Sequence, residues 1–275
     1  MPLWLDDAFL RIVDTLYSLP RHAPTPAQLA ACRIVSHRGE RDDRTVLENT
    51  YAAFDPLRGS GVFGLELDVR WTADLVPVVF HDAHFLRLFG DPRALRDTDA
   101  ATLAGRYPQV PTLHDFVRRY CDEFHLMVEL KAEPYPDPAL QDRRLAEALA
   151  PALERERVHV LTLQPSMLAQ LPSIPAARTL GVGRLNSARI SREALGAGRG
   201  GFACHYAALG RRQIAAHHAA GQRVGCGFPP SSALLRREAA RGVDWVFTNR
   251  ALGLERWRQQ ALRSMQDPGT PAPRG

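Results

Sequence analysis

Short apolar segments alternate with helical segments along most of the sequence, and this alternation constrains the fold more than any other feature. Nine segments have the length and the apolar composition of buried strands. Strands that alternate with helices are typical of α/β folds with a parallel sheet. The predicted strands are Arg33–Ser36, Val62–Val69, Val76–Phe80, His125–Leu130, Val158–Leu163, Thr179–Val182, Gly201–His205, Arg223–Cys226 and Trp245–Thr248.

Nine strands are one too many for a simple eightfold repeat. The gap between Val69 and Val76 is too short for the crossover that a parallel pair needs, which takes about a dozen residues. We therefore expect Val76–Phe80 to pair antiparallel or to lie outside the parallel set. The remaining eight strands and their helices fill about the ~250 residues of a TIM barrel. The prediction is an α/β fold, a (β/α)8 TIM barrel with an extra β-hairpin strand, a short insertion after it and an N-terminal helix.

No break in composition divides the chain, so residues 32–262 are predicted to form a single barrel domain. Residues 1–31 form a helical extension, in which Leu3–Leu19 has helical apolar spacing with acidic residues on the other side. We favour a helix that covers an exposed end of the core. The alternative is a helix on a membrane surface, although such helices usually carry a basic polar face. Residues 263–275, rich in Pro and Gly, are expected to be a disordered tail.

Charge and cysteine content exclude several functional classes. The net charge is +5 with a pI near 9.3, but the arginines are spread along the chain without stacked aromatics, which argues against nucleic-acid binding. No apolar run approaches the ~18 residues of a membrane span. With no secretory apolar region, the four cysteines are expected to be reduced thiols of a cytoplasmic protein. They are far apart and lack metal-binding spacing: Cys32, Cys121, Cys204 and Cys226.

Two predicted strands carry charged side chains on one face. Because side chains alternate along a strand, Glu66 and Asp68 share one face, and Glu129 and Lys131 share one face of a second strand. In a β/α barrel, polar residues near the carboxyl ends of strands lie at the mouth, where active sites are built. We therefore expect these four residues to meet there. The alternative is that they form ordinary ion pairs on half-exposed strands.

Three carboxylates and one ammonium leave negative charge in excess at this mouth. Carboxylates that converge in a desolvated site cannot all remain ionised unless a cation joins them. A ligand set made of oxygen atoms alone selects a hard ion, Mg²⁺ or Ca²⁺, over zinc. The sequence therefore predicts a divalent metal site at Glu66, Asp68 and Glu129.

Two histidines follow predicted strands and complete the candidate site. His37 and His81 can exchange protons near neutral pH, so one can accept a proton while the other donates one. Arg38 offers a planar set of donors suited to phosphate, and Gly39 permits close approach of another backbone segment. Lys131 is the only lysine among the 35 Lys and Arg residues.

These residues resemble the glycerophosphodiester phosphodiesterases, a TIM-barrel family whose relatives include sphingomyelinase-D-like enzymes. The resemblance covers Ser36 to Lys131, and it rests on six motifs in the order of the family pattern. The motifs are His37-Arg38-Gly39, Glu48-Asn49-Thr50, Glu66-Leu67-Asp68-Val69, His81-Asp82, Pro111-Thr112-Leu113 and Glu129-Leu130-Lys131.

The resemblance implies a role for each site residue. Glu66, Asp68 and Glu129 would hold the metal, and His37 and His81 would be the acid/base pair. Arg38 and Lys131 would bind the oxygens of the substrate phosphate. The implied reaction is hydrolysis of small glycerophosphodiesters, or of a related lysophospholipid, to glycerol 3-phosphate and an alcohol, through attack by the neighbouring glycerol hydroxyl and a cyclic phosphate.

The resemblance fades after Lys131 and therefore carries over to the reaction centre rather than to substrate recognition. The family's Ser-Phe is replaced by Gln164-Pro165, its Trp-Thr-Val-Asn by residues 224–228, and its closing Thr-Asp by Thr248-Asn249. Two alternatives follow. One is a sphingomyelinase-D-like enzyme or another phosphodiesterase, with the N-terminal helix near a membrane. The other is a non-catalytic barrel that only binds phosphodiesters.

Overall fold

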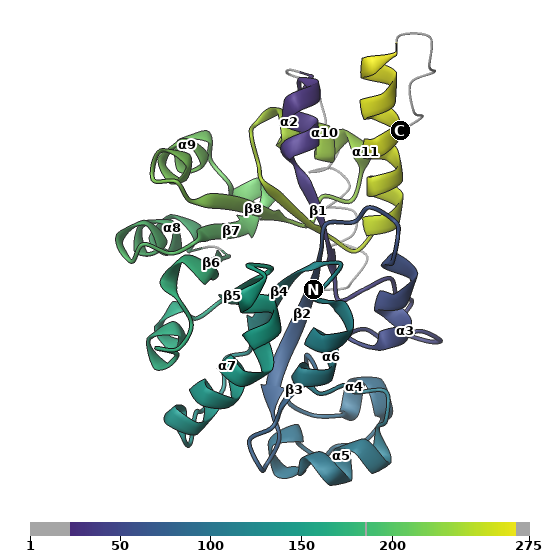
Figure 1. Cartoon of the computed structure of the whole chain (residues 1–275), viewed down its shortest axis with the longest axis vertical. Coiled ribbons are helices and arrows are strands. Elements are labelled where there is room, and N and C mark those ends of the chain that lie inside the picture. The colour runs from purple at the N-terminus through teal and green to yellow at the C-terminus, as the bar shows by residue number, and fades with distance from the viewer. Residues whose placement is uncertain (1–22, 185, 268–275) are drawn as a thin grey trace, which may run out of the picture.

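Eight parallel strands close into a barrel in the computed structural model, which describes residues 23–184 and 186–267 (Figure 1). The ring closes because β1 pairs in parallel with both β2 and β9. The predicted TIM barrel is confirmed. Its strands are β1 (Arg33–His37), β2 (Gly64–Trp71), β4 (His125–Leu130), β5 (Val158–Thr162), β6 (Thr179–Gly183), β7 (Gly201–His205), β8 (Arg223–Gly227) and β9 (Trp245–Thr248).

Helices surround the barrel, as the alternating sequence pattern predicts (Figure 1). The crossover from β5 to β6 differs from the others because it contains only the 3-10 helices η3 (Pro165–Gln170) and η4 (Ala176–Arg178). Pro172 and Pro175 prevent a longer helix there, since proline cannot continue the hydrogen-bond ladder. The α-helices are α2 (Pro26–Ala31), α3 (Tyr51–Phe54), α4 (Leu86–Phe89), α5 (Ala100–Arg106), α6 (Leu113–Tyr120), α7 (Pro138–Glu154), α8 (Ser187–Gly196), α9 (Arg211–Ala219), α10 (Ser232–Ala240) and α11 (Ala251–Gln266).

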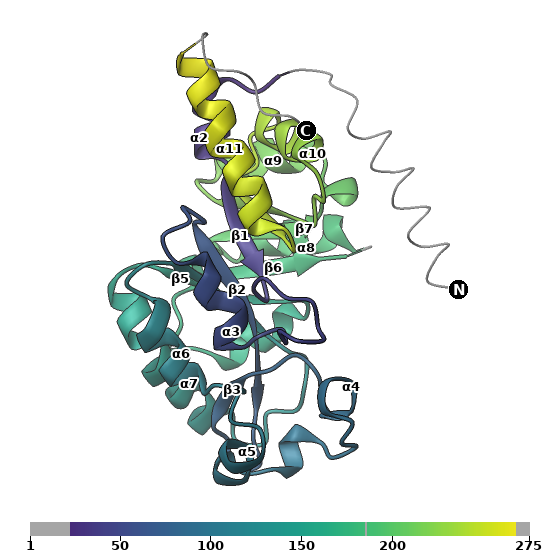
Figure 2. The same ribbon diagram turned by 90° about the vertical axis from the view of Figure 1, so that its right-hand side faces the viewer.

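The short strand β3 (Pro77–Val79) lies outside the barrel and pairs antiparallel with the end of β2, as expected from the short gap before it. This pairing extends β2 to Trp71, two residues beyond the predicted end at Val69. The insertion after β3, residues 83–110, contains α4, α5 and the 3-10 helix η2 (Leu95–Asp97). It packs around its own apolar cluster at one edge of the molecule, beside β3 (Figure 2).

Helices stand at both ends of the barrel, near the predicted domain boundaries at residues 32 and 262. Helix α2 begins at the cap residue Thr25 and packs against α10 and α11 before the chain enters β1. Helix α11 runs to Gln266, past residue 262, because Ala261 and Leu262 continue to bury apolar surface and no proline interrupts the last turn. The predicted helix Leu3–Leu19 and residues 268–275 lie outside the described residues. Two further 3-10 helices, η1 (Asp55–Leu57) and η5 (Tyr206–Ala208), complete the elements.

Two histidines are hydrogen-bonded to each other at the amino-terminal end of the barrel. His125 Nε2 lies 2.7 Å from His159 Nδ1, and both rings pack against Trp245. Burial and the charge of Arg178 lower the pKa of His125 to about 4. Burial, followed by the neighbouring His125, lowers the pKa of His159 to about 3. The fold therefore holds both imidazoles neutral.

Acidification is expected to destabilise the fold through this pair. A histidine whose pKa is lower in the folded chain than in the unfolded chain contributes to the stability of the fold. That contribution is complete above the unfolded pKa, near 6.5, and is lost as pH falls toward the folded pKa. Between pH 8 and pH 5 we expect a loss of about 2 kcal/mol for each histidine. His159→Gln should remove about half of this loss in urea unfolding, whereas the exposed His84→Gln should not change it. If the stability of His159→Gln depended on pH as strongly as that of the wild type, the two buried histidines would not cause the loss of stability in acid.

Candidate active site

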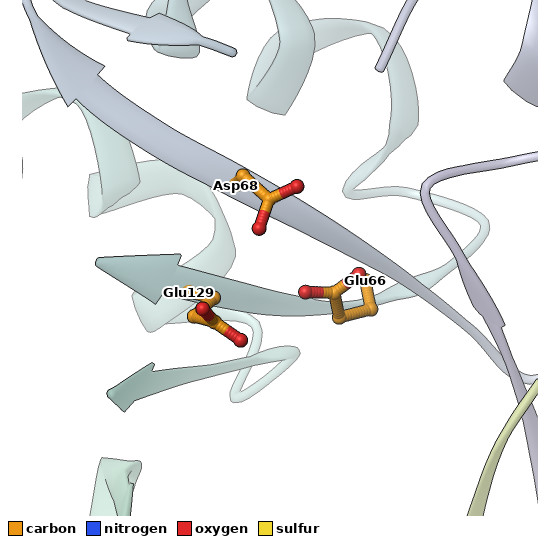
Figure 3. Close-up of side chains that lie close together, drawn as sticks. All are labelled: Glu66, Asp68 and Glu129. Atoms are coloured by element: carbon orange, nitrogen blue, oxygen red, sulfur yellow. The ribbon is translucent and has the colours of Figure 1, made fainter. Parts of the chain in front are cut away.

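Three carboxylates meet near the carboxyl ends of β2 and β4. Glu66 and Asp68 come from one face of β2, and Glu129 lies beside Asp68 in the register of β4 (Figure 3). One oxygen of each carboxylate lies within 4.8 Å of the other two. Glu66 and Asp68 are buried, so the alternative of ordinary pairs on half-exposed strands is wrong. The predicted convergence of the three residues is confirmed.

The carboxylate of Glu66 lacks the partners that a buried charge needs. Neither of its oxygens has a hydrogen-bond partner among the described residues, and His37 Nε2 lies 3.7 Å from Oε2. Burial, with the charges of Asp68 and Glu129, raises the pKa of Glu66 well above its usual value. A divalent cation would supply the missing positive charge. The three carboxylates thus fit a hard cation bound through oxygen.

Asp68 is the most strongly anchored of the three carboxylates. Lys131 Nζ lies 2.6 Å from its Oδ1, and Arg38 Nε lies 2.8 Å from its Oδ2. Asn49 Nδ2 donates a hydrogen bond of 2.8 Å to the same Oδ2. Burial acts to raise the pKa of Asp68, but Lys131 and Arg38 outweigh it and lower that pKa to about 2. Asp68 is therefore ionised in the folded protein.

Lys131 joins two of the carboxylates. Besides its contact with Asp68, its ammonium pairs with Glu129, two residues earlier on the same strand face. Burial acts to lower the pKa of Lys131, but Asp68 and Glu129 outweigh it and raise that pKa. Lys131 therefore carries its charge at the edge of the carboxylate cluster, where the sequence predicts it.

His37, at the end of β1, is held in one tautomer. Its Nδ1 lies 2.7 Å from Oδ1 of Asn249, which follows β9. An amide oxygen can only accept, so Nδ1 carries the hydrogen and Nε2 has a free lone pair on the side of Glu66. Burial, and then the charge of Arg38, lower the pKa of His37 to about 4. The imidazole can therefore accept a proton at Nε2.

His81 has a different partner. Its Nδ1 lies 2.6 Å from Oδ1 of the adjacent Asp82, so that Nδ1 carries the hydrogen and Nε2 remains for proton transfer. Arg87, in α4, donates from Nε to the other oxygen of Asp82 at 2.6 Å. Arg70 Nε donates to the backbone oxygen of His81 at 2.7 Å. The insertion after β3 thus helps to fix the second histidine.

Glu48 forms ion pairs with three arginines next to the site. Arg38 Nη1 donates to both of its oxygens at 3.3 Å, Arg41 Nε lies 3.4 Å from Oε2, and Arg87 pairs with Oε1. Burial acts to raise the pKa of Glu48, but Arg87 and Arg38 outweigh it and lower that pKa. The buried carboxylate therefore fixes the positions of Arg38 and Arg87.

The local sequence explains why the chain turns as it does at Arg38. Arg38 has a φ of 60° and Gly39 a φ of 84°, and only glycine adopts such values without strain. A Cβ on Gly39 would lie 2.6 Å from the Cβ of Ala53 in α3, so glycine is also required by this close contact. Thr50 caps α3, and Asn49 just before it reaches Asp68. The Glu48-Asn49-Thr50 motif thus joins α3 to the site.

A cavity of about 460 Å³ opens over these groups. Its size lies within the range of ordinary small-molecule pockets. Six of the seven predicted site residues line it, while Asp68 is buried behind them. The six are His37, Arg38, Glu66, His81, Glu129 and Lys131.

The structure brings all seven predicted residues together. It also adds partners that the sequence analysis did not assign to the site: Asn249 on His37, Asp82 on His81, and Asn49 on Asp68. Asp82 and Asn49 could have been found from the sequence, because both stand within the motifs quoted in the sequence analysis. Nothing in the sequence pattern links Asn249 to His37, which are 212 positions apart and meet only because β9 closes the barrel against β1.

Comparison with known proteins shows which family the segment around this site resembles. Residues 37–164 match the model of the glycerophosphoryl diester phosphodiesterase family. YhdW of Bacillus subtilis (strain 168), named for glycerophosphodiester phosphodiesterase activity, is 32% identical over 112 residues. That match covers 37% of this chain and 45% of YhdW, so it spans less than half the length of this curated relative.

Solved structures share the whole barrel. A Galdieria sulphuraria protein named for the same activity has a TM-score of 0.69 at 19% identity, over 82% of this chain and 97% of its own. An Oleispira antarctica phosphodiesterase, solved with its product sn-glycerol-3-phosphate, has a TM-score of 0.67 at 20% identity, over 82% and 95%. At these identities the likeness establishes the fold. The segment from residue 37 to residue 164, which contains every predicted site residue, is similar to the glycerophosphoryl diester phosphodiesterase family.

Proposed function

We propose that this protein is a metal-dependent phosphoric diester hydrolase that splits glycerophosphodiesters into glycerol 3-phosphate and an alcohol. One observation carries the proposal: three converging carboxylates lie beside two histidines with free Nε2 atoms and two cationic side chains, within the segment that matches the family. The product seen in the Oleispira antarctica phosphodiesterase supports the same chemistry.

In this proposal each side chain has a defined task. Glu66, Asp68 and Glu129 would hold Mg²⁺ or Ca²⁺, which when bound would act as a Lewis acid on the phosphate. Arg38 and Lys131 bind phosphate oxygens and stabilise the charge that develops on them. They also orient the phosphorus for attack by the neighbouring glycerol hydroxyl.

Two proton transfers accompany the bond changes. One of His37 and His81 takes the proton of the attacking hydroxyl at Nε2, and the other gives a proton to the oxygen of the departing alcohol. The P–O bond to the alcohol breaks as a cyclic phosphate forms. Water then opens the ring and restores the protons, giving glycerol 3-phosphate.

One experiment distinguishes the proposed function from its two alternatives, a sphingomyelinase-D-like enzyme and a non-catalytic barrel. The full chain is assayed with glycerophosphocholine, glycerophosphoethanolamine, sphingomyelin and bis(p-nitrophenyl) phosphate, each with Mg²⁺ and with Ca²⁺. We expect release of glycerol 3-phosphate from the two glycerophosphodiesters. Release of ceramide 1-phosphate alone would instead identify a sphingomyelinase-D-like activity. Binding of glycerophosphocholine without turnover of any substrate would overturn the enzymatic proposal in favour of a non-catalytic barrel.

We also propose a small-molecule phosphodiester as the partner and the cytoplasm as the location. All four cysteines are free thiols and are buried, which suits a reducing compartment. Within the described ranges, no helix is both long and apolar enough to cross a bilayer. The proposal includes no nucleic-acid partner, and membrane association is kept as the less favoured alternative.

A further inference from the structure

A largely buried ion pair lies behind His81, outside the set of residues that the proposed reaction uses. Arg70, near the end of β2, places Nη1 2.8 Å from Oε2 of Glu133, which follows β4. Only 13% of the Arg70 side chain and 14% of the Glu133 side chain are exposed. Such a pair is weak evidence for stability, because the cost of removing two charges from water can exceed their attraction. It can instead fix the geometry of the groups that it contacts.

Arg70 connects this pair to the backbone of His81. The antiparallel ladder between β2 and β3 ends where the N–H of Phe80 donates to the oxygen of Asp68. Beyond that point Arg70 Nε donates to the backbone oxygen of His81 at 2.7 Å. One planar guanidinium thus binds His81 through Nε and Glu133 through Nη1, so each contact restricts the direction of the other. A shift of Arg70 would move the backbone that carries the imidazole.

Glu133 is itself held in place on the other side of the pair. Its Oε1 accepts a hydrogen bond of 3.2 Å from the backbone N–H of Trp71. Tyr135, with a proline on each side, packs edge-on against Trp71 with the ring centroids 5.9 Å apart. Burial raises the pKa of Glu133, although Arg70 acts to lower it. The carboxylate is therefore costly at this position, and its contacts are specific.

The segment that ends at Glu133 also contributes to the carboxylate cluster. Glu129, Lys131 and Glu133 follow one another at intervals of two residues, and Lys131 pairs with both Asp68 and Glu129. Residues 129–133 therefore contact the carboxylate cluster at one end and the support of His81 at the other. One short segment links the proposed metal site to the second histidine.

We propose that Arg70 and Glu133 are positioning residues for proton transfer by His81. This inference rests on the proposed function, in which His81 is one of the two proton carriers. Glu133 fixes the guanidinium of Arg70, and Arg70 fixes the backbone of His81, so that Nε2 stays within reach of the oxygen with which it exchanges a proton. Neither residue lines the cavity, so both act through His81. A displacement of about 1 Å can lower a rate by about 10²-fold.

A double-mutant cycle on kcat, with glycerophosphocholine as the substrate, tests this assignment. Glu133→Gln keeps the shape of the side chain and removes the charge that holds Arg70, so kcat should fall by about 10-fold or more, with KM within about twofold of the wild type. Arg70→Lys keeps the charge and loses the planar pair of donors, so its effect should be similar. In a chain that already carries His81→Asn, neither substitution should lower the remaining kcat further.

Measurements other than turnover distinguish positioning from a general loss of structure. Glu255→Gln breaks a more deeply buried ion pair in α11, with Arg258, and should lower Tm without lowering kcat. Glu133→Gln should keep the rise in Tm that Mg²⁺ or Ca²⁺ produces in the wild type, because the three carboxylates of the cluster are unchanged. If Glu133→Gln did not fold, Arg70→Lys would complete the same cycle.

The outcomes separate this inference from the proposed function. An equal fall in kcat with and without His81→Asn would show that the ion pair acts on the fold as a whole, and would overturn the positioning role while leaving the hydrolase intact. Unchanged kcat in both Glu133→Gln and Arg70→Lys would overturn it as well. No cleavage of any diester by the wild type, with either metal, would overturn the proposed function and this inference together.

Discussion

His37→Asn is expected to lower kcat by about 10²-fold or more, the range seen when a general acid or base is removed. Asparagine can still donate a hydrogen bond toward Oδ1 of Asn249, the contact that fixes His37 at 2.7 Å. It has no atom in the place of Nε2, the nitrogen on the side of Glu66. The substitution therefore removes proton transfer and keeps the local anchor. Steady-state kinetics with glycerophosphocholine give kcat and KM separately.

A loss of folding must be distinguished from a loss of chemistry. His114→Asn, at an exposed position of α6 where the ring lies beside Asp115, is the matched control and should keep full activity. Thermal unfolding of both variants should lie close to that of the wild type. If His37→Asn retained more than a tenth of kcat, His37 would not be one of the two proton carriers.

The barrel could be predicted because each strand is specified by the length and composition of its own segment. Segment length and apolar composition identified all nine strands, and the short gap after Val69 correctly set β3 apart from the parallel ring. The absence of an α-helix between β5 and β6 was also visible in principle, since Pro165, Pro172 and Pro175 stand there. Strand ends shifted by one or two residues, because pairing with a neighbour such as β3 determines where β2 stops.

The site was predictable where its geometry is local. Glu66 and Asp68 are two residues apart on one strand, as are Glu129 and Lys131, so alternation alone places each pair on one face. The contacts that orient the site are not local. Asn249 contacts His37 where β9 pairs with β1 and closes the barrel. Arg87, in the insertion after β3, contacts Asp82 and Glu48. Such contacts depend on how loops fold over the barrel, which no periodicity in the sequence encodes.

The charged and the apolar sides of the cavity differ in what a substitution is expected to cost. In the proposed site, Glu66, Asp68 and Glu129 share one cation, so a change at one of them would leave buried charge unbalanced. The apolar side chains of β5 to β9 that line the cavity have no such constraint, because one apolar side chain can replace another at modest cost. The match to the family ends at residue 164, just after Leu161 and Leu163, the first apolar lining residues on this side of the cavity.

Removal of the metal is expected to abolish activity and to lower stability, and Glu66→Gln should reproduce both effects. In EDTA the wild type should show no phosphodiester cleavage, and Mg²⁺ or Ca²⁺ should restore it. A metal at about 100 times its Kd stabilises the folded state by about 2.7 kcal/mol, which corresponds to a rise in Tm of about 5–10 °C for a domain of this size. Glutamine keeps the shape of Glu66 but removes the buried charge whose oxygens have no hydrogen-bond partner in the described chain.

Differential scanning fluorimetry and calorimetric titration with each metal measure the binding without reference to turnover. Glu66→Gln should show no metal-dependent rise in Tm, no heat of binding and a loss of kcat of about 10³-fold, comparable with the loss of a catalytic electrostatic contact. Metal-free Glu66→Gln should unfold no earlier than the metal-free wild type, because the uncompensated charge is gone. Glu147→Gln, at an exposed position of α7, should keep the metal response of the wild type. Full activity in EDTA, or an unchanged metal-dependent Tm in Glu66→Gln, would refute a cation at these three carboxylates.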